Sequence, residues 1–357
     1  MRINRIIFLG IIGIAVAIVA VSLLTNNGME QATGLIGSEK APFFEDERVQ
    51  RALRRHGLEV TVQKAGSREI ATSFDLSQYD FAFPAGAPAA EKIQRETGAS
   101  KSVTPFFTPM AIASWKPIAD LFVQQGIARD EGGYFTIDMN ALLPLLQAQA
   151  RWKDIPNNTA FAANKSVLIT TTDVRKSNSA AMYLALMSYV ANGDNIVESM
   201  QEAQPLMQLL TDMFLRQGLR PSSSQEPFED YLVKGMGHSP AVMVYEAQFI
   251  AQAARGDGSI QPDMVLMYPV PTLFTKHILI PLSAGGEKLA EALATDPELQ
   301  KLAIEYGFRN DNLAYFQEFV QSHSVTLPDS FVDVIEPPSY EVLEGMIQII
   351  EQAYQQQ

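Results

Sequence analysis

The sequence predicts an α/β protein of two lobes, joined by two extended crossover strands and preceded by one N-terminal transmembrane helix. Short apolar runs alternate with amphipathic helical stretches along most of the chain. Two long extended segments, each interrupted by prolines, lie far apart in the sequence, and a long uncharged apolar run lies near the N-terminus. The length of 357 residues suits two domains of roughly 150 residues each.

Charge and composition exclude several classes of protein. The chain carries 27 Lys and Arg against 40 Asp and Glu, so it lacks the basic surface that nucleic-acid binding requires, and we expect no nucleic-acid partner. A hydrophobic content of 47% is that of a globular protein. The absence of cysteine excludes both a disulfide framework and a lipid attached through cysteine.

The N-terminus predicts a membrane anchor. Residues 6–24 form an uncharged apolar run about as long as a helix needs to cross a bilayer. Arg2 and Arg5 precede it and no Lys or Arg follows before Lys40, so residues 1–5 should be a cytoplasmic stub. We therefore expect a single-pass protein of the inner (cytoplasmic) membrane, with its soluble domain in the periplasm or outside. The alternative is a cleaved signal peptide.

Periodicity places the other elements in chain order, after a polar spacer at 25–33. Expected strands cover 33–37, 58–63, 80–84, 104–114, 166–171, 241–245 and 264–269. Expected helices cover 46–56, 89–97, 179–191, 205–217, 246–255, 286–294 and 339–354.

Two long extended segments, 103–114 and 264–283, mark the passages between lobes. Prolines within them confine such strands to sheet edges or to crossings between domains. The stretch that they enclose is the size of one domain. The chain therefore divides into a first lobe of 34–110 and 270–357 and a second lobe of 111–269, with a paired hinge between them.

Several segments carry a family resemblance. They read GLIGSEK at 34–40, AGSREI at 65–70, YDFAFPAG at 79–86, TPFFTPMAIASWKPIADLF at 104–122, TTTDVRKSNSAAMYLAL at 170–186, PAVMVYEAQF at 240–249 and YPVPT at 268–272. In this order they resemble the bacterial extracellular solute-binding proteins of the type II periplasmic-binding-protein fold. The resemblance implies that a small molecule is captured in a cleft between the lobes, with an ABC-type transporter permease as a further partner.

Candidate ligand-binding residues lie where strands end and helices begin, the place at which open α/β sheets bind ligands. They are Ser38, Glu39, Ser67, Arg68, Ser177, Asn178, Ser179 and Tyr245. Most of them have a structural alternative. The serines and Asn178 can serve as helix caps, Arg68 can pair with a neighbouring carboxylate, and Tyr245 can be a core residue.

The ligand class follows from these residue types. Hydroxyls, an amide and Arg68 at helix N-termini favour an anion or oxyanion, and a sugar is the second choice. No catalytic set, metal motif or phosphate-binding loop is readable, so we expect no enzyme and no cofactor. The rival function is that of a structural or stress-response membrane protein on the same fold, for example one linked to toxic-anion resistance.

Overall fold

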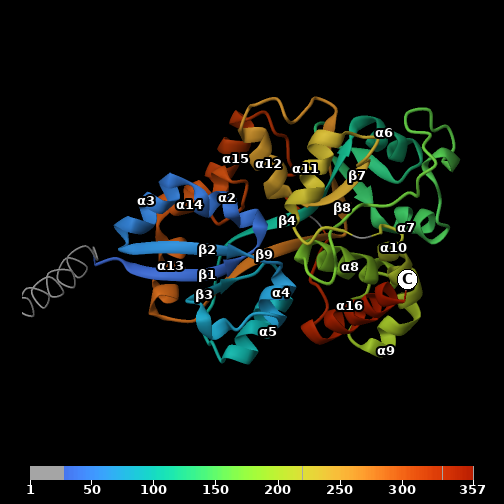
Figure 1. Ribbon diagram of the computed structural model, residues 1–357. Helices are drawn as coiled ribbons and strands as arrows, with labels where there is room; N and C mark the ends of the chain where they lie inside the picture. Colours follow the sequence, from blue (N-terminus) through green and yellow to red (C-terminus); the bar gives the residue numbers. More distant parts are fainter. Residues whose placement is uncertain (1–27, 219, 332, 357) are drawn as a thin grey trace, which may run out of the picture.

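A computed structural model describes residues 28–218, 220–331 and 333–356 (Figure 1). The predicted stub, the predicted anchor at 6–24 and residues 25–27 lie outside this part. Among the described residues no helix is both long and apolar enough to span a bilayer. The predicted spacer is too long, because the first strand already begins at Glu30.

The described residues form a mixed set of strands and helices. The strands are β1 (Glu30–Ile36), β2 (Leu58–Lys64), β3 (Phe81–Phe83), β4 (Val103–Trp115), β5 (Ala128–Asp130), β6 (Phe135–Asp138), β7 (Ala241–Tyr245), β8 (Met264–Val270), β9 (Thr272–Pro281) and β10 (Val334–Ile335). The helices are α2 (Ala41–Glu45), α3 (Glu47–Arg55), α4 (Ser67–Thr72), α5 (Ala87–Thr97), α6 (Lys116–Gln124), α7 (Met139–Gln147), α8 (Asn178–Ala191), α9 (Met200–Ala203), α10 (Met207–Leu215), α11 (Gln225–Lys234), α12 (Glu246–Ala254), α13 (Ala284–Thr295), α14 (Pro297–Glu305), α15 (Leu313–Ser322) and α16 (Tyr340–Gln355).

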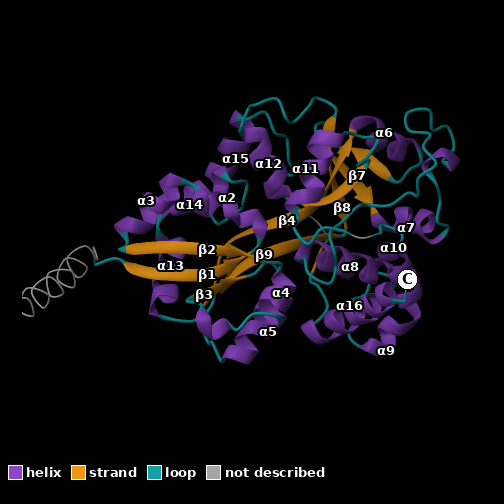
Figure 2. Ribbon diagram, viewed as in Figure 1, coloured by secondary structure: helices purple, strands orange, loops and turns teal. Residues whose placement is uncertain are grey.

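The strands make one extended sheet with two halves (Figure 2). Its order is β2-β1-β3-β9-β4-β8-β6-β5, with β7 also on β4 and β10 on β9. In the first half β1 runs parallel to β2 and β3, and β9 runs antiparallel to β3. In the second half β7 and β8 run antiparallel to β4, and β6 runs parallel to β8. We call the first half with its helices the first lobe and the second half with its helices the second lobe.

Two crossover strands join the lobes, as the sequence predicts. Strand β4 pairs with β9 from Val103 to Pro109 and then with β7 and β8 from Met110 to Trp115, so it runs through both lobes. The chain returns through β8 and β9. The pairing of β4 with β9 shifts register between Val103 and Phe106, beside Pro105, which has no N–H to donate to a ladder.

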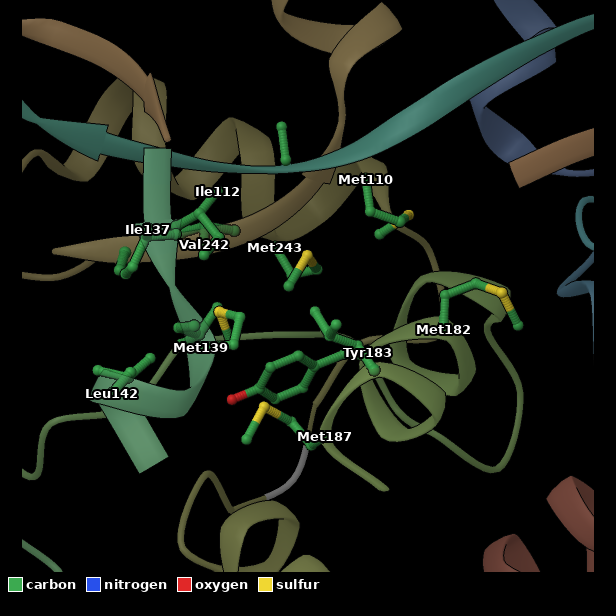
Figure 3. Packing of buried hydrophobic residues seen from close by; sticks show 14 of the residues in the cluster. Met110, Ile112, Ile137, Met139, Leu142, Met182, Tyr183, Met187, Val242 and Met243 are labelled. Carbon is green, nitrogen blue, oxygen red and sulfur yellow. The ribbon is translucent and has the colours of Figure 1, made fainter. Parts of the chain in front are cut away.

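The core of the second lobe surrounds α8. This helix is apolar on nearly all sides, a pattern typical of a helix buried within a domain. Figure 3 shows Tyr183 and Met187 of α8 facing side chains of β4, β6, β7 and α7. Because α8 is enclosed, its first turn is held firmly where the two lobes meet.

The C-terminal helix corrects one predicted boundary. The sequence placed 270–357 in the first lobe, yet α16 packs mainly on α10, α9 and α8, although it also contacts α5 of the first lobe, and Leu343, Met346 and Ile350 belong to the core of the second lobe. In Figure 1 this red helix lies beside the green helices of that lobe. The other predicted boundaries of the two lobes remain predictions.

One predicted strand is wrong. In 166–171, Ser166 and Thr170 each form a single bridge, to Arg151 and to Val242. Since the two bridges have different partners, no ladder forms and the segment stays irregular.

Candidate functional site

A pocket of about 490 Å³ lies between the two lobes. From the first lobe it is lined by the ends of β1 and β2 and the turns that follow them, and from the second lobe by the end of β7 and the start of α8. The lining residues are Gly37, Ser38, Glu39, Ala41, Pro42, Glu45, Lys64, Ala65, Gly66, Ser67, Glu69, Ser177, Asn178, Ser222, Ser223, Ser224, Gln225, Glu226, Glu229 and Tyr245. Six of the eight sequence-predicted residues are among them; Arg68 and Ser179 are not.

Ser38 joins the two walls of the pocket. It begins the short 3-10 turn that follows β1, and its Oγ accepts a hydrogen bond of 3.0 Å from the hydroxyl of Ser223 in the second lobe. The two lobes therefore contact each other directly across the pocket.

Glu39 belongs to a buried charged cluster at the floor of the pocket. Its carboxylate pairs with Lys40 and lies 3.4 Å from Nδ1 of His277, while the Lys40 ammonium lies 3.1 Å from the same nitrogen and 5.0 Å from the centre of the Phe83 ring. Lys40 and His277 are fully buried, and the sequence did not single out either. A lone lysine beside a predicted strand end gives no signal of such a pairing.

The protonation of this cluster follows from its burial. Burial alone would raise the pKa of Glu39, but the Lys40 charge and the His277 hydrogen bond outweigh it and hold that pKa well below its usual range. Burial, helped by the Lys40 charge, lowers the pKa of His277 to about 4, so the imidazole is neutral at pH 7. Burial also lowers the pKa of Lys40, against the attraction of Glu39.

Ser67 and Arg68 take different roles. Ser67 lines the pocket, and its Oγ accepts a hydrogen bond of 2.9 Å from the backbone N–H of Ala85. Arg68 turns away: it binds both carboxylate oxygens of Glu344 on α16 and donates to the carbonyl of Arg175 at 2.6 Å. Arg68 therefore does not line the pocket, and its guanidinium is engaged by a distant carboxylate rather than by a neighbour in sequence.

The start of α8 supplies the polar end of the second lobe. The Ser177 side chain caps no backbone N–H; its hydroxyl lies 3.1 Å from that of Ser179, which bonds Thr172 at 2.8 Å. Asn178 donates to the Tyr245 hydroxyl at 3.1 Å. Ser179 is thus a buried bridge behind the pocket, and the first N–H groups of α8 have no side-chain cap.

Tyr245 is a buried core residue that also reaches the pocket. Its ring packs edge-on against His277, 5.8 Å between centres. Burial raises the pKa of its hydroxyl well above the usual value, and the Glu39 charge adds to this effect. The hydroxyl therefore remains a neutral hydrogen-bonding group.

Sequence reasoning missed the wall formed by residues 222–229. Three consecutive serines precede α11, and Glu226 and Glu229 lie one turn apart on that helix. The signal was a serine run before a helix start, which is typical of capping and so was not singled out.

A neighbouring cavity of about 480 Å³ shares Glu39, Pro42, Glu45 and Gln225 with the pocket, so the groove between the lobes continues past α2. Within residues 28–218, 220–331 and 333–356 no three His, Asp or Glu side chains are grouped so as to hold a metal ion.

No family model matches the sequence, and no curated protein matches it. Solved structures match the fold. The sulfate-binding protein of Mycobacterium tuberculosis is 16% identical, with a TM-score of 0.52 over 90% of this chain and 98% of that chain. An ABC transporter solute-binding protein from Thermotoga lettingae, bound with α-D-tagatose, is 12% identical, with a TM-score of 0.53 over 91% and 94%. The apo ferric ion-binding protein A of Pasteurella haemolytica is 10% identical, with a TM-score of 0.52 over 91% and 96%.

These three structures are binding proteins rather than enzymes, and each covers nearly the whole chain. At such low identity the likeness concerns the fold alone. The chain therefore has the mixed α/β, two-lobed fold of the periplasmic solute-binding proteins.

Proposed function

We propose that this protein is an extracytoplasmic solute-binding protein that captures a small polar molecule between its lobes. The observation that carries the proposal is the pocket of about 490 Å³ in which serines, Asn178 and Tyr245 converge from both lobes. Small-molecule sites have volumes of about 300–1,000 Å³ and a few convergent polar groups. The binding-protein fold supports the same conclusion.

The expected negative charge of the solute has lost its main support. It rested on Arg68, which Glu344 engages, and on helix N-termini. The uncapped start of α8 still suits an anion, but five of the six charged side chains that line the pocket are glutamates. We therefore propose a polar solute and no longer assign it a negative charge.

Binding can be tested on the full-length chain by thermal-shift and titration calorimetry with a library of small polar solutes. A ligand that binds only the folded state raises stability by RT ln(1 + [L]/Kd). Ser224→Ala should weaken binding without destabilising the fold, because the Ser224 hydroxyl has no hydrogen-bond partner among the described residues. Ser73→Ala, at an exposed serine outside the pocket, is the matched control.

A chain that binds no solute in the library would contradict the proposal. It would fit instead the structural or stress-response membrane protein that the sequence leaves open.

We also propose that residues 6–24 anchor the protein in the inner membrane and that the solute passes to an ABC-type permease. The uncharged run behind Arg2 and Arg5 supports the anchor, and the Thermotoga lettingae protein supports the transporter. The anchored chain should resist carbonate extraction and be digested by protease added to spheroplasts. A soluble periplasmic form that starts near Met29 would show that the segment is cleaved.

A further inference from the structure

Most of the charged side chains around the pocket are negative. Glu69 lies on the wall of the first lobe, where its carboxylate is 3.4 Å from the Lys176 ammonium, and Glu226 and Glu229 lie on the facing wall of the second lobe. Lys64, the single lysine of the lining, lies 3.9 Å from Glu45. Within the described part of the chain, Glu226 and Glu229 form no ion pair, although Gln225 donates to Glu229 at 3.1 Å.

Carboxylates on both walls affect closure. When the lobes approach each other, like charges come together and oppose the closed state. A cation between the walls removes this repulsion and is favoured by the potential that a narrow cleft concentrates. The cluster at the floor does not supply that cation, because the Lys40 charge is already matched by Glu39.

A second, independent observation points to a ligand at the same place. Ser224 lines the pocket and is only 4% exposed, yet its hydroxyl has no hydrogen-bond partner among the described residues. A buried hydroxyl without a partner is unfavourable unless another group bonds it. Of the described lining residues only Tyr245 is aromatic and it is buried, so the pocket offers no ring surface for a sugar to stack on.

We infer that the solute carries a positively charged amino or guanidino group, which faces Glu69, Glu226 and Glu229 while the serine hydroxyls bond its other polar atoms. This inference rests on the proposed function and specifies its ligand class.

The test is a thermal-shift and calorimetric screen of the full-length chain with cationic, neutral and anionic solutes. It includes putrescine, butanediol and succinate, which share a four-carbon chain and differ in charge. The tightest binder should be an organic cation, and its Kd should rise with added salt because exposed carboxylates are screened. A tightest binder that is anionic, neutral or a metal ion alone overturns the inference but leaves the proposed function intact. Binding by no solute overturns both.

The double variant Glu226→Gln/Glu229→Gln makes the test specific to this wall. Both side chains are exposed, so the substitutions leave the fold intact. The Kd of the tightest-binding cation should rise about tenfold, the size expected for two exposed charges. Asp230→Asn is the matched control on the same helix, because Asp230 pairs with Lys234 and does not line the pocket. An equal effect of the control, or no effect of the double variant, would overturn the inference.

Discussion

Removing the ion pair between Arg68 and Glu344 should open the two lobes. Arg68 lies on α4 of the first lobe and Glu344 on α16, which packs mainly against the second lobe and also contacts α5 of the first. The guanidinium donates to the two carboxylate oxygens at 2.8 and 2.6 Å, and the side chains are only 19% and 12% exposed. The pair therefore acts only while the lobes are together.

The magnitude follows from this burial. Breaking a fully buried pair costs about 3–5 kcal/mol, whereas an exposed pair contributes about 0–1 kcal/mol. In Glu344→Gln the arginine keeps the carbonyl of Arg175 and has Glu351 at 3.6 Å, so the loss should be intermediate. We expect about 2 kcal/mol, or roughly a thirtyfold shift from the closed to the open arrangement.

The chain has no cysteine, so two introduced cysteines are unique labelling sites. Arg51→Cys on α3 and Val233→Cys on α11 place spin labels at exposed positions, one in each lobe. Double electron–electron resonance should show a longer distance between the two spin labels in Glu344→Gln than in the doubly labelled parent. Glu287→Gln, which breaks an exposed pair with Lys101 inside the first lobe, is the control. An unchanged distance distribution in Glu344→Gln would refute the reasoning.

Three further predictions concern Gly86, which lies against Asn178 of the pocket lining, and the buried charged cluster. Gly86→Ala should lower the free energy of unfolding in urea by about 1–3 kcal/mol, because φ is +87° and the added Cβ would overlap the side-chain amide of Asn178. The control Gly98→Ala, at φ +70° in open space, should lower it by only about 1 kcal/mol. Lys40→Met should lose about 3–5 kcal/mol by leaving Glu39 buried without its partner, and adding Glu39→Gln should restore much of the loss; no recovery would show that the charge is not the cause. The pKa of His277 is lowered to about 4, so as the pH falls this histidine is protonated in the unfolded chain before it is protonated in the folded one. The free energy of unfolding should therefore be highest above pH 6.5 and fall by up to about 3 kcal/mol towards pH 4. His277→Gln should flatten this slope above about pH 4.5, and an unchanged slope would contradict the assignment.

Local patterns predicted much of the fold. The strand expected at 241–245 is β7, because an apolar run there follows a proline and leads into a helix. The predicted crossover through 103–114 is β4, because few other roles suit a long strand with internal prolines. Helix α14 was not among the helices that periodicity placed by range, although Asp296 caps it and Pro297 occupies its first position, a start signal present in the sequence.

Distant pairings could not be predicted in the same way. Arg68 was assigned to the ligand because its partner Glu344 lies 276 residues away, and no spacing rule connects them. The assignment of α16 to the first lobe was wrong for the same reason. An apolar stripe shows that a helix is buried, but it does not show which elements the helix packs against. Ser38 and Ser67 do lie together at the pocket, because the ends of the parallel strands β1 and β2 meet at one edge of the sheet, and their role in binding stays a prediction.

The path of the chain through β4, β8 and β9 determines when each lobe can be completed. The first lobe needs β9 beside β3, and β9 is made only after nearly all of the second lobe. The second lobe in turn packs α16, the last helix of the chain. Each lobe can therefore finish folding only after a distant segment, β9 for the first and α16 for the second, has been synthesised. Until then the chain should expose unpaired strand edges and depend on chaperones that hold such edges apart.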